Sequence, residues 1–265
     1  MILDKIVERK KEEVATLKRL GIHLPKPFSD CQVAPPRGFR QALIDYPGVA
    51  IIAEAKKASP SKGLISPDFD PVRIALNYQA NGAQALSVLT DVDFFQGSLL
   101  YLMQAREAVE LPVLRKDFII DAIQIEEAHL HGADAVLLIA AILSVEQISA
   151  FRFQAQACGL DSLVEVHDEP EVEKALKAGA DLIGINNRNL NDFSVDLNTT
   201  FRLKKIIPPE IPVVSESGLS CAGDLASLKQ AGVQAALIGE SLMRAGKNSR
   251  LLSTLRESGQ EEQAC

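Results

Sequence analysis

The sequence is short of several features that commonly indicate a function. It has no tryptophan, and its four cysteines, at positions 31, 158, 221 and 265, form no CxxC pair and have no histidine cluster beside them, so we expect reduced thiols and no metal site. No run approaches the ~18 consecutive apolar residues of a membrane-spanning helix, and the charged opening MILDKIVERKKEEV is unlike the apolar core of a signal peptide. These absences favour a cytoplasmic protein without a membrane partner.

Excess positive charge is also missing. The net charge is −7 and the pI is near 5.2, which argues against a nucleic-acid partner, although local donors could still bind a small anionic ligand. The 265 residues are 47% hydrophobic, so the chain can bury one large core. One large domain is simpler than two small ones.

A repeated phrase organises most of the chain. A glycine closes a helical pattern, a short polar turn follows, and then comes a buried run too short for another helix. The four occurrences are NGAQALSVLT (81–90), HGADAVLLIA (131–140), AGADLIGINN (178–187) and AGVQAALIGE (231–240). These are predicted helix-to-strand joints, spaced at about twice the length of one strand-plus-helix unit.

Further strand candidates fill the gaps between these joints, at 49–56, 111–118, 161–167 and 211–217. Each of the eight predicted strands is followed by a segment in which apolar residues recur at helical spacing. Eight strand-plus-helix units predict an α/β fold, a single closed (β/α)₈ TIM barrel. The competing open, doubly wound sheet lacks its GxGxxG fingerprint here.

Residues 1–48 precede the barrel and are predicted as an N-terminal helical extension. It comprises a helix near 2–19, a proline-spaced linker around 24–36 and a short helix in GFRQALIDY. The extension could plug the bottom or pack on the side of the barrel, or it could cover the top. Residues 49–258 are the predicted catalytic barrel, and 259–265 a flexible tail.

Charged residues stand late in several predicted strands, where the apolar pattern should continue. Glu54 and Lys56 are two residues apart, so strand alternation puts both on one face, and Lys116, Glu165 and Asn186 end later strands. Catalytic side chains of such barrels project from the C-terminal ends of strands, and burying charge is costly for stability. We expect these side chains to converge in one mouth; a purely structural salt-bridge cluster is the alternative.

Two smaller questions accompany this prediction. Asn186 and Arg188, in NNRN, could belong to a loop that caps backbone groups instead of a site. His129 and His131 lie on a predicted helix beside its closing glycine, so we expect both to be exposed to solvent.

Glycine and serine occur together after the seventh and eighth predicted strands, in SESGLS and LIGESLMRAG. These two loops commonly hold phosphate in such barrels. Gly218 and Gly239 let the backbone approach a ligand, and the Ser241 hydroxyl and nearby N–H groups can donate to an anion. Ser59, after the first strand, could add another hydroxyl. An acidic chain could bind a phosphate in this way.

These motifs resemble those of the indole-3-glycerol phosphate synthase family. The matching segments, in the expected order, are IAEAKKASPSKG, LTDVDFFQGS, PVLRKDFIID, LVEVH, IGINNRNL, VSESGL and IGESLM. The resemblance covers nearly the whole chain, including the helical extension. It implies a decarboxylase-cyclase of tryptophan biosynthesis. Its substrate would be 1-(2-carboxyphenylamino)-1-deoxyribulose 5-phosphate, closed to an indole with loss of CO₂ and water and without a cofactor.

The resemblance also implies roles for individual residues. Lys116 would be the general acid that protonates the substrate ketone, Glu165 its partner in dehydration, and Lys56 the lysine that contacts the substrate carboxylate. Glu54 and Asn186 would orient the substrate hydroxyls and the lysines, and Arg188 would lie near the carboxylate. Glu216 and the catalytic Ser217 would lie near the sugar-phosphate chain, and Phe95 and Phe118 would pack against the aromatic ring. The residues matched to the phosphate pocket are Ser59, Gly218, Gly239 and Ser241.

Other functions remain open on the sequence alone. A Schiff-base aldolase would use Lys116 as its nucleophile, and a sugar-phosphate isomerase would need a cysteine or aspartate pair where Glu54 and Asn186 stand. A non-catalytic binding protein would have lost the acid–base set, which is present here. For the assembly, we expect a monomer or weak homo-oligomer.

Overall fold

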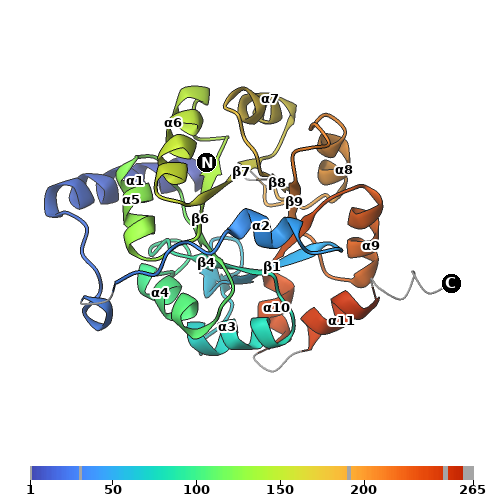
Figure 1. Cartoon of the computed structure of the whole chain (residues 1–265), viewed down its shortest axis with the longest axis horizontal. Helices are drawn as coiled ribbons and strands as arrows, with labels where there is room; N and C mark the ends of the chain where they lie inside the picture. Colours follow the sequence, from blue (N-terminus) through green and yellow to red (C-terminus); the bar gives the residue numbers. More distant parts are fainter. Residues whose placement is uncertain (1, 30–31, 190–191, 247–249, 259–265) are drawn as a thin grey trace.

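Eight parallel strands close into a barrel in the part of the chain that the computed structural model describes, residues 2–29, 32–189, 192–246 and 250–258 (Figure 1). The strands are β1 (Ala50–Ala55), β4 (Ala85–Leu89), β5 (Val113–Lys116), β6 (Ala135–Ile139), β7 (Asp161–Val166), β8 (Ile183–Asn186), β9 (Val213–Glu216) and β10 (Ala235–Ile238). The ring closes where β1 pairs with β10, with Ala50 opposite Ala235. The predicted (β/α)₈ barrel is confirmed.

Helices alternate with these strands and cover the outside of the ring (Figure 1). They are α3 (Pro71–Ala80), α4 (Leu99–Ala108), α5 (Ile123–Leu130), α6 (Val145–Ala157), α7 (Glu169–Lys177), α8 (Asn198–Lys204), α9 (Ala222–Gln230) and α11 (Leu251–Ser258). Polar caps explain where several begin: Asp70 accepts from the N–H of Arg73 at the start of α3, and Ser144 forms a capping box at the start of α6. The glycines of the four predicted joints have φ between 70° and 85°, the left-handed conformation that ends a helix.

Apolar side chains fill both faces of the ring. Outward-facing residues pack against the helices, while branched and small residues such as Ile52, Leu114 and Leu163 fill the interior. The bottom is closed by α2 (Phe39–Ile44), which lies over the centre of the ring in Figure 1. Phe39 and Leu43 of this helix are fully buried against the interior cluster. Part of the extension therefore plugs the barrel.

The other helix of the extension, α1 (Ile2–Leu20), takes the second predicted position. Its residues Ile2, Leu3 and Ile6 line the cavity at the opposite, C-terminal end of the barrel. Each of the two alternatives for residues 1–48 thus applies to one helix: α2 plugs the bottom of the barrel, and α1 lies at its top. A 3₁₀ turn, Lys26–Phe28, interrupts the predicted linker between them.

Some local features differ from the expectations. A two-stranded hairpin, β2 (Ala58–Ser59) with β3 (Gly63–Leu64), and a short helix, α10 (Glu240–Ala245), were not predicted as separate elements. The expected exposure of the two histidines was wrong: His129 is half-buried, and His131 is buried. The Nδ1 of His131 donates to the carbonyl of Glu127 at 2.8 Å, and its ring also meets the backbone of His23 in the extension. The predicted tail, 259–265, lies outside the described residues.

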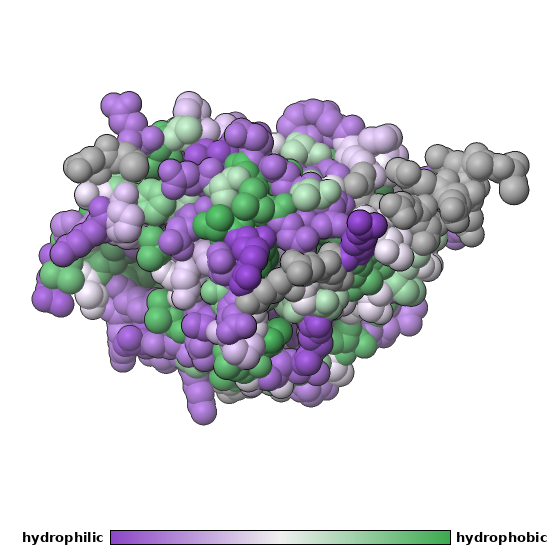
Figure 2. Space-filling model, turned by 90° about the horizontal axis from the view of Figure 1, so that it is seen from below, coloured by the Kyte–Doolittle hydropathy of each residue, from purple (hydrophilic) through white to green (hydrophobic). Residues whose placement is uncertain are grey.

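The surface is mixed in character. On the face drawn in Figure 2, hydrophilic and hydrophobic residues are interspersed. Exposed apolar side chains include Val72 and Leu76 on α3. Among the described helices, none combines the length and apolar character needed to cross a bilayer.

Candidate active site

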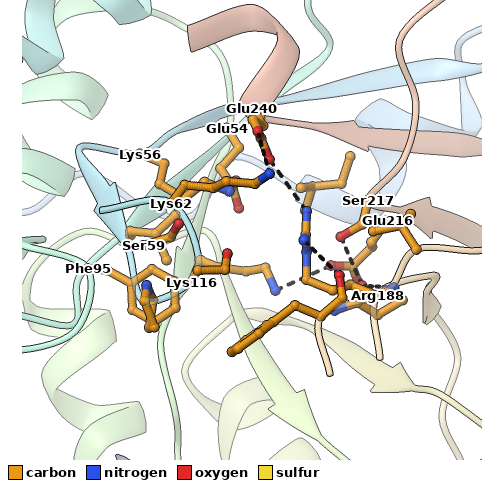
Figure 3. Close-up of a pocket in the computed structure, with 18 of the residues that line it drawn as sticks. Glu54, Lys56, Ser59, Lys62, Phe95, Lys116, Arg188, Glu216, Ser217 and Glu240 are labelled. Carbon is orange, nitrogen blue, oxygen red and sulfur yellow. Dashed lines mark hydrogen bonds and ion pairs between the residues drawn. The ribbon is translucent and has the colours of Figure 1, made fainter. Parts of the chain in front are cut away.

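A cavity of about 550 Å³ opens at the C-terminal ends of the strands, and all of the predicted site residues line it (Figure 3). Four of them, Glu54, Lys116, Glu165 and Asn186, come from four different strands. Because parallel strands of a barrel end at one rim, residues far apart in the chain meet there. The predicted convergence is confirmed.

Lys116 ends β5, and its ammonium lies between two buried carboxylates. Nζ is 2.8 Å from Glu165 Oε2 on β7 and 3.3 Å from Glu216 Oε2 on β9. Figure 3 shows Lys116 and Glu216 pointing into the same space from different strands. The resemblance had assigned Glu216 to the sugar-phosphate chain, whereas this geometry also makes it a direct partner of Lys116.

The pKa values of Lys116, Glu165 and Glu216 are shifted in different ways by their surroundings. Burial alone would lower the pKa of Lys116, but the attraction of Glu165 and the neighbouring carboxylates outweighs burial and holds that pKa well above its ordinary value. Burial would raise the pKa of Glu165, yet Lys116 and His167 bring it down to about 2. Burial and repulsion from Glu165 raise the pKa of Glu216 to about 7. At neutral pH the site therefore holds an ammonium, a carboxylate and a carboxyl group close to its titration point.

Two glycines make room for the carboxylates. Glu54, on β1, forms an ion pair with Lys56, and a Cβ at Gly239 would overlap with the Glu54 carboxylate. Gly184, on β8, leaves the same kind of space for Glu216. Gly239 was predicted only to let a phosphate approach, and the role of Gly184 was not predicted. The sequence did offer a signal for Gly184, because a glycine inside a buried strand often marks a place where another group approaches the backbone closely.

Asn186 connects neighbouring strand ends. Its side chain hydrogen-bonds to Glu165, and its Oδ1 accepts from Ser217 Oγ at 2.9 Å and from the N–H of Arg188 at 3.0 Å. Ser217 has a φ of 67°, in the left-handed region that favours glycine. Such backbone persists where its surroundings hold it, often at functional sites.

Three cationic side chains gather near the predicted phosphate loops. They surround Glu240, the first residue of α10, which lies 3.7 Å from Lys62, 3.5 Å from Arg188 and 3.1 Å from Arg244. Ser241 lies beside them and donates from Oγ to a backbone carbonyl at 3.1 Å. Lys62 and Arg244 were not predicted. The cluster around Glu240 therefore holds three positive side chains and one negative one, although the whole chain is acidic.

An apolar wall faces these charges across the cavity. The rings of Phe95 and Phe118 lie 6.0 Å apart between centroids. Ile2, Leu3 and Ile6 of α1 line the same cavity. The wall is suited to the flat aromatic part of a ligand.

A buried lysine on α1 holds that helix to the barrel. Lys10 Nζ lies 2.7 Å from Glu13 Oε2, 3.0 Å from Asp91 Oδ2 and 2.9 Å from Asp117 Oδ1. Burial opposes the charge on Lys10, but Asp117 and Asp91 outweigh it and raise its pKa. Sequence analysis missed this residue, because a lysine on an amphipathic helix is usually exposed.

The partners of Lys10 also hold the apolar wall. Asp91 Oδ1 accepts from the N–H of Phe95 at 3.2 Å, and Asp117 Oδ1 accepts from the N–H of Phe118 at 2.8 Å. The ion-pair cluster thus joins α1 to the backbone of both aromatic residues.

A second missed residue is His167, in the quoted motif LVEVH. Its Nε2 lies 3.5 Å from Glu165 Oε1, and its Nδ1 lies 3.0 Å from Glu171 Oε2 on α7. It lines a second cavity, of about 770 Å³, that adjoins the first at Leu3, Asn186 and Arg188.

Within residues 2–29, 32–189, 192–246 and 250–258, no three histidine, cysteine, aspartate or glutamate side chains are arranged to hold a metal ion.

A closed (β/α)₈ barrel with a buried lysine between two carboxylates at its C-terminal mouth defines a barrel enzyme of acid–base chemistry. The model of the family described as indole-3-glycerol phosphate synthase matches residues 3–255. The chain therefore belongs to the indole-3-glycerol phosphate synthase family. Its activity is that of a decarboxylating lyase of tryptophan biosynthesis.

Similar proteins carry the same family name. An indole-3-glycerol phosphate synthase of Desulfotalea psychrophila is 65% identical over 254 residues, covering 96% of this chain and 98% of that protein. One from Chlorobium luteolum is 54% identical over 244 residues, covering 91% and 92%.

Solved structures with low identity share the fold. A thiamine phosphate pyrophosphorylase from Pyrococcus furiosus has a TM-score of 0.59 at 19% identity, covering 80% of this chain and 96% of that one. An N-acetylmannosamine-6-phosphate 2-epimerase from Clostridium perfringens has a TM-score of 0.58 at 16% identity, covering 74% and 88%. At these identities the likeness concerns the barrel alone.

Proposed function

We propose that Lys116 is the general acid of ring closure and that Glu165 is its partner in the later dehydration. The observation that carries this proposal is the position of Lys116 Nζ, 2.8 Å from Glu165 Oε2 inside the cavity. As the aromatic carbon attacks the ketone, its oxygen needs a proton, and loss of that oxygen as water needs an acid and a base together. A buried ammonium beside a carboxylate supplies both.

The other charged groups orient the substrate in this proposal. Lys56 contacts the substrate carboxylate, while Glu54 holds the Lys56 ammonium by an ion pair. Asn186 and Ser217 fix the Glu165 side of the mouth through their mutual hydrogen bond. Ammonium groups near the carboxylate offset its charge before CO₂ leaves.

The two ends of the substrate have separate places. The phosphate binds at the loops after β9 and β10, where Gly218, Gly239 and Ser241 lie, together with Ser59. The excess of positive side chains around Glu240 supports this assignment. The aromatic ring packs against Phe95 and Phe118, and Arg188 lies between the two regions, paired with Glu240.

The Schiff-base aldolase reading is disfavoured by the state of Lys116. A nucleophilic lysine must be a neutral amine, usually with a lowered pKa. The pKa of Lys116 is instead raised, because the attraction of Glu165 and its neighbours exceeds the effect of burial. Borohydride reduction with substrate present should leave Lys116 unmodified; a covalent adduct on it would contradict the acid role.

The activity is tested by following indole fluorescence after adding 1-(2-carboxyphenylamino)-1-deoxyribulose 5-phosphate to the protein, with and without a chelator. Formation of indole-3-glycerol phosphate at equal rates is expected, because the proposed chemistry needs only side chains. No product, or product only without chelator, would contradict it.

Cellular context and organisation are also proposals. We propose that the chain acts in the cytoplasm as a monomer or weak homo-oligomer, without nucleic-acid or membrane partners. Its acidic charge and the free thiols of Cys158 and Cys221 support this. We also propose that 1–48 serves as an extension to the catalytic barrel, 49–258, with 259–265 as a tail.

A further inference from the structure

The reaction consumes one proton in each turnover. In ring closure, the aromatic carbon that bears the carboxylate bonds to the ketone carbon, and the ketone oxygen takes a proton. The bond to the carboxylate then breaks, its electron pair restores the aromatic ring, and CO₂ leaves without charge. Dehydration is balanced by itself, because an acid gives a proton to the leaving hydroxyl and a base takes one from the neighbouring carbon. The charge of the lost carboxylate must therefore be replaced by one proton from solvent.

The cavity that holds the substrate is a poor route for that proton. The substrate fills the space above Lys116 and Glu165 during the reaction, and closure of an active site excludes water. Glu165 is almost fully buried. A path that reaches Glu165 from another side would let the proton enter while substrate is bound.

His167 offers such a path. Its Nε2 faces Glu165 Oε1, whereas Lys116 contacts the other oxygen, Oε2. Nδ1 of the same ring meets Glu171, so the imidazole lies between two carboxylates at 3.5 Å and 3.0 Å. Within the described part of the chain, Nε2 is buried and has no hydrogen-bond partner, which leaves it available to Glu165. Hydrogen bonds of catalytic groups are often long before substrate binds.

Glu165, His167 and Glu171 form a row of side chains, and the Glu171 end of this row reaches the second cavity. Glu171 and His167 both line it, together with residues of α1 and of the segment after β8. The cavity is distinct from the substrate cavity, although the two adjoin at Leu3, Asn186 and Arg188. Solvent in it can therefore exchange protons with the pair of His167 and Glu171 while the first cavity is occupied.

We propose that Glu171 and His167 form a proton relay that delivers the consumed proton from the second cavity to Glu165. The relay rests on the proposed roles of Lys116 and Glu165. The charged imidazole gives its Nε2 proton to Glu165 and becomes a neutral ring. Solvent in the second cavity then returns one proton to the ring, and Glu171, 3.0 Å from Nδ1, stabilises the restored positive charge. No oxidant, metal or further reactant is needed.

The charges around His167 favour a ring that carries its proton. Burial lowers the pKa of His167, but Glu171 and Glu165, with Glu216 behind them, outweigh burial and raise it. The same cavity is lined by Asp4, Glu8 and Lys11 of α1 and by Arg202 of α8. Asp168, also on its wall, is engaged in capping α7.

The test compares His167→Gln, His167→Ala and Glu171→Gln with the unmodified protein in the indole fluorescence assay. We expect kcat to fall about tenfold or more in the His167 variants, since a lost proton-transfer group commonly costs about 10²–10⁴-fold and water can replace part of a relay. KM should change little, and added imidazole should restore turnover in His167→Ala. The alkaline limb of the kcat profile, which reports loss of the imidazole proton, should be absent in His167→Gln.

Glu173→Gln is the matched control, because Glu173 lies on the same helix, is exposed and forms an ion pair with Lys177, which is also exposed. It should behave as the unmodified protein. A kcat within twofold of the unmodified value in His167→Gln would overturn the relay, and so would a lower kcat that imidazole does not restore with the pH profile unchanged. If the unmodified protein itself makes no indole product, the proposed function fails instead.

Discussion

Lys10 Nζ lies 2.9 Å from Asp117 Oδ1, and both side chains are almost completely buried. Asp117 directly follows Lys116 in the chain, and Lys10 also reaches Asp91, which holds the N–H of Phe95. The ammonium of Lys10 thereby contacts the residue that follows the proposed acid, Lys116, and the residue that holds the backbone of the aromatic wall. The position of α1 and the shape of the mouth are therefore physically linked.

Replacing Lys10 with methionine should damage both stability and substrate binding. It leaves Asp91 and Asp117 without their shared cation, and breaking a buried ion pair typically costs about 3–5 kcal/mol. Urea unfolding should show a loss of this order, and KM should rise more than kcat falls. Lys11→Met is the control, because Lys11 lies on the same helix but is exposed and forms its ion pair with Glu8, which is also exposed. Equal unfolding midpoints for the two variants would argue against the link.

Lys116→Ala should lower turnover with the fold retained. A general acid commonly contributes about 10²–10⁴-fold to the rate, so kcat should fall within that range. Circular dichroism should show unchanged secondary structure. Lys177→Ala, on the exposed face of α7, should leave kcat unaltered. Near-normal turnover in Lys116→Ala would remove this lysine from the mechanism.

Gly239→Ala should reduce kcat as well as raise KM. Its Cβ would overlap with the Glu54 carboxylate, which must move and carry Lys56 with it. Inhibition by inorganic phosphate should also weaken, since the phosphate loop starts here. Gly223→Ala, on α9, is the matched control, because its Cβ would have only an ordinary contact, 3.7 Å from a sulfur atom. If both variants keep full activity, Gly239 does not constrain the site.

Stability should respond to pH through Glu216. Its pKa is 4.5 ordinarily and about 7 in the folded protein, chiefly because it is buried. Between these values the folded state holds a proton that the unfolded state has lost, so this group's contribution to stability falls as pH rises from 4.5 to 7. The free energy of unfolding of Glu216→Gln, minus that of the unmodified protein, should therefore be larger at pH 8 than at pH 5. Denaturant unfolding at both values checks this; a difference that does not depend on pH would contradict it.

The two helices of the extension should fail differently when they are removed. Deleting 1–20 removes α1 and its part of the cavity wall, so KM should rise. Deleting 1–45 also exposes the interior that Phe39 and Leu43 cover, so a much larger drop in melting temperature is expected. Calorimetry and steady-state kinetics on both truncations distinguish the roles. Identical defects would mean that α1 has no separate effect on the site.

Regular features were the predictable ones. The glycine-turn-strand phrase located four of the eight strands, because a left-handed helix end and a short buried run depend on local residues. The other four were predicted from buried runs that follow proline or glycine turns. Strand alternation then placed Glu54 beside Lys56, and barrel geometry gathered the remaining strand-end residues. The resemblance supplied the roles that geometry alone leaves open.

The unpredicted features depend on contacts between distant residues. Lys10 is buried only because Asp91 and Asp117 meet it from two loops of the barrel, and nothing in its own helix indicates those partners. His131 is buried where its ring meets the backbone of His23 in the N-terminal extension, and its position beside a glycine does not reveal that contact. Gly184 has its role because Glu216, on the next strand, points at it.

Pairing of β1 with β10 also matters while the protein is being made. Ala50 and Ala235 face each other in this pairing, so a nascent chain on the ribosome cannot complete the ring until its last strand has emerged. Until then, β1 and the most recently synthesised strand each present an unpaired edge to neighbouring chains. Translation products that stop before β10 should consequently depend on chaperones to avoid aggregation.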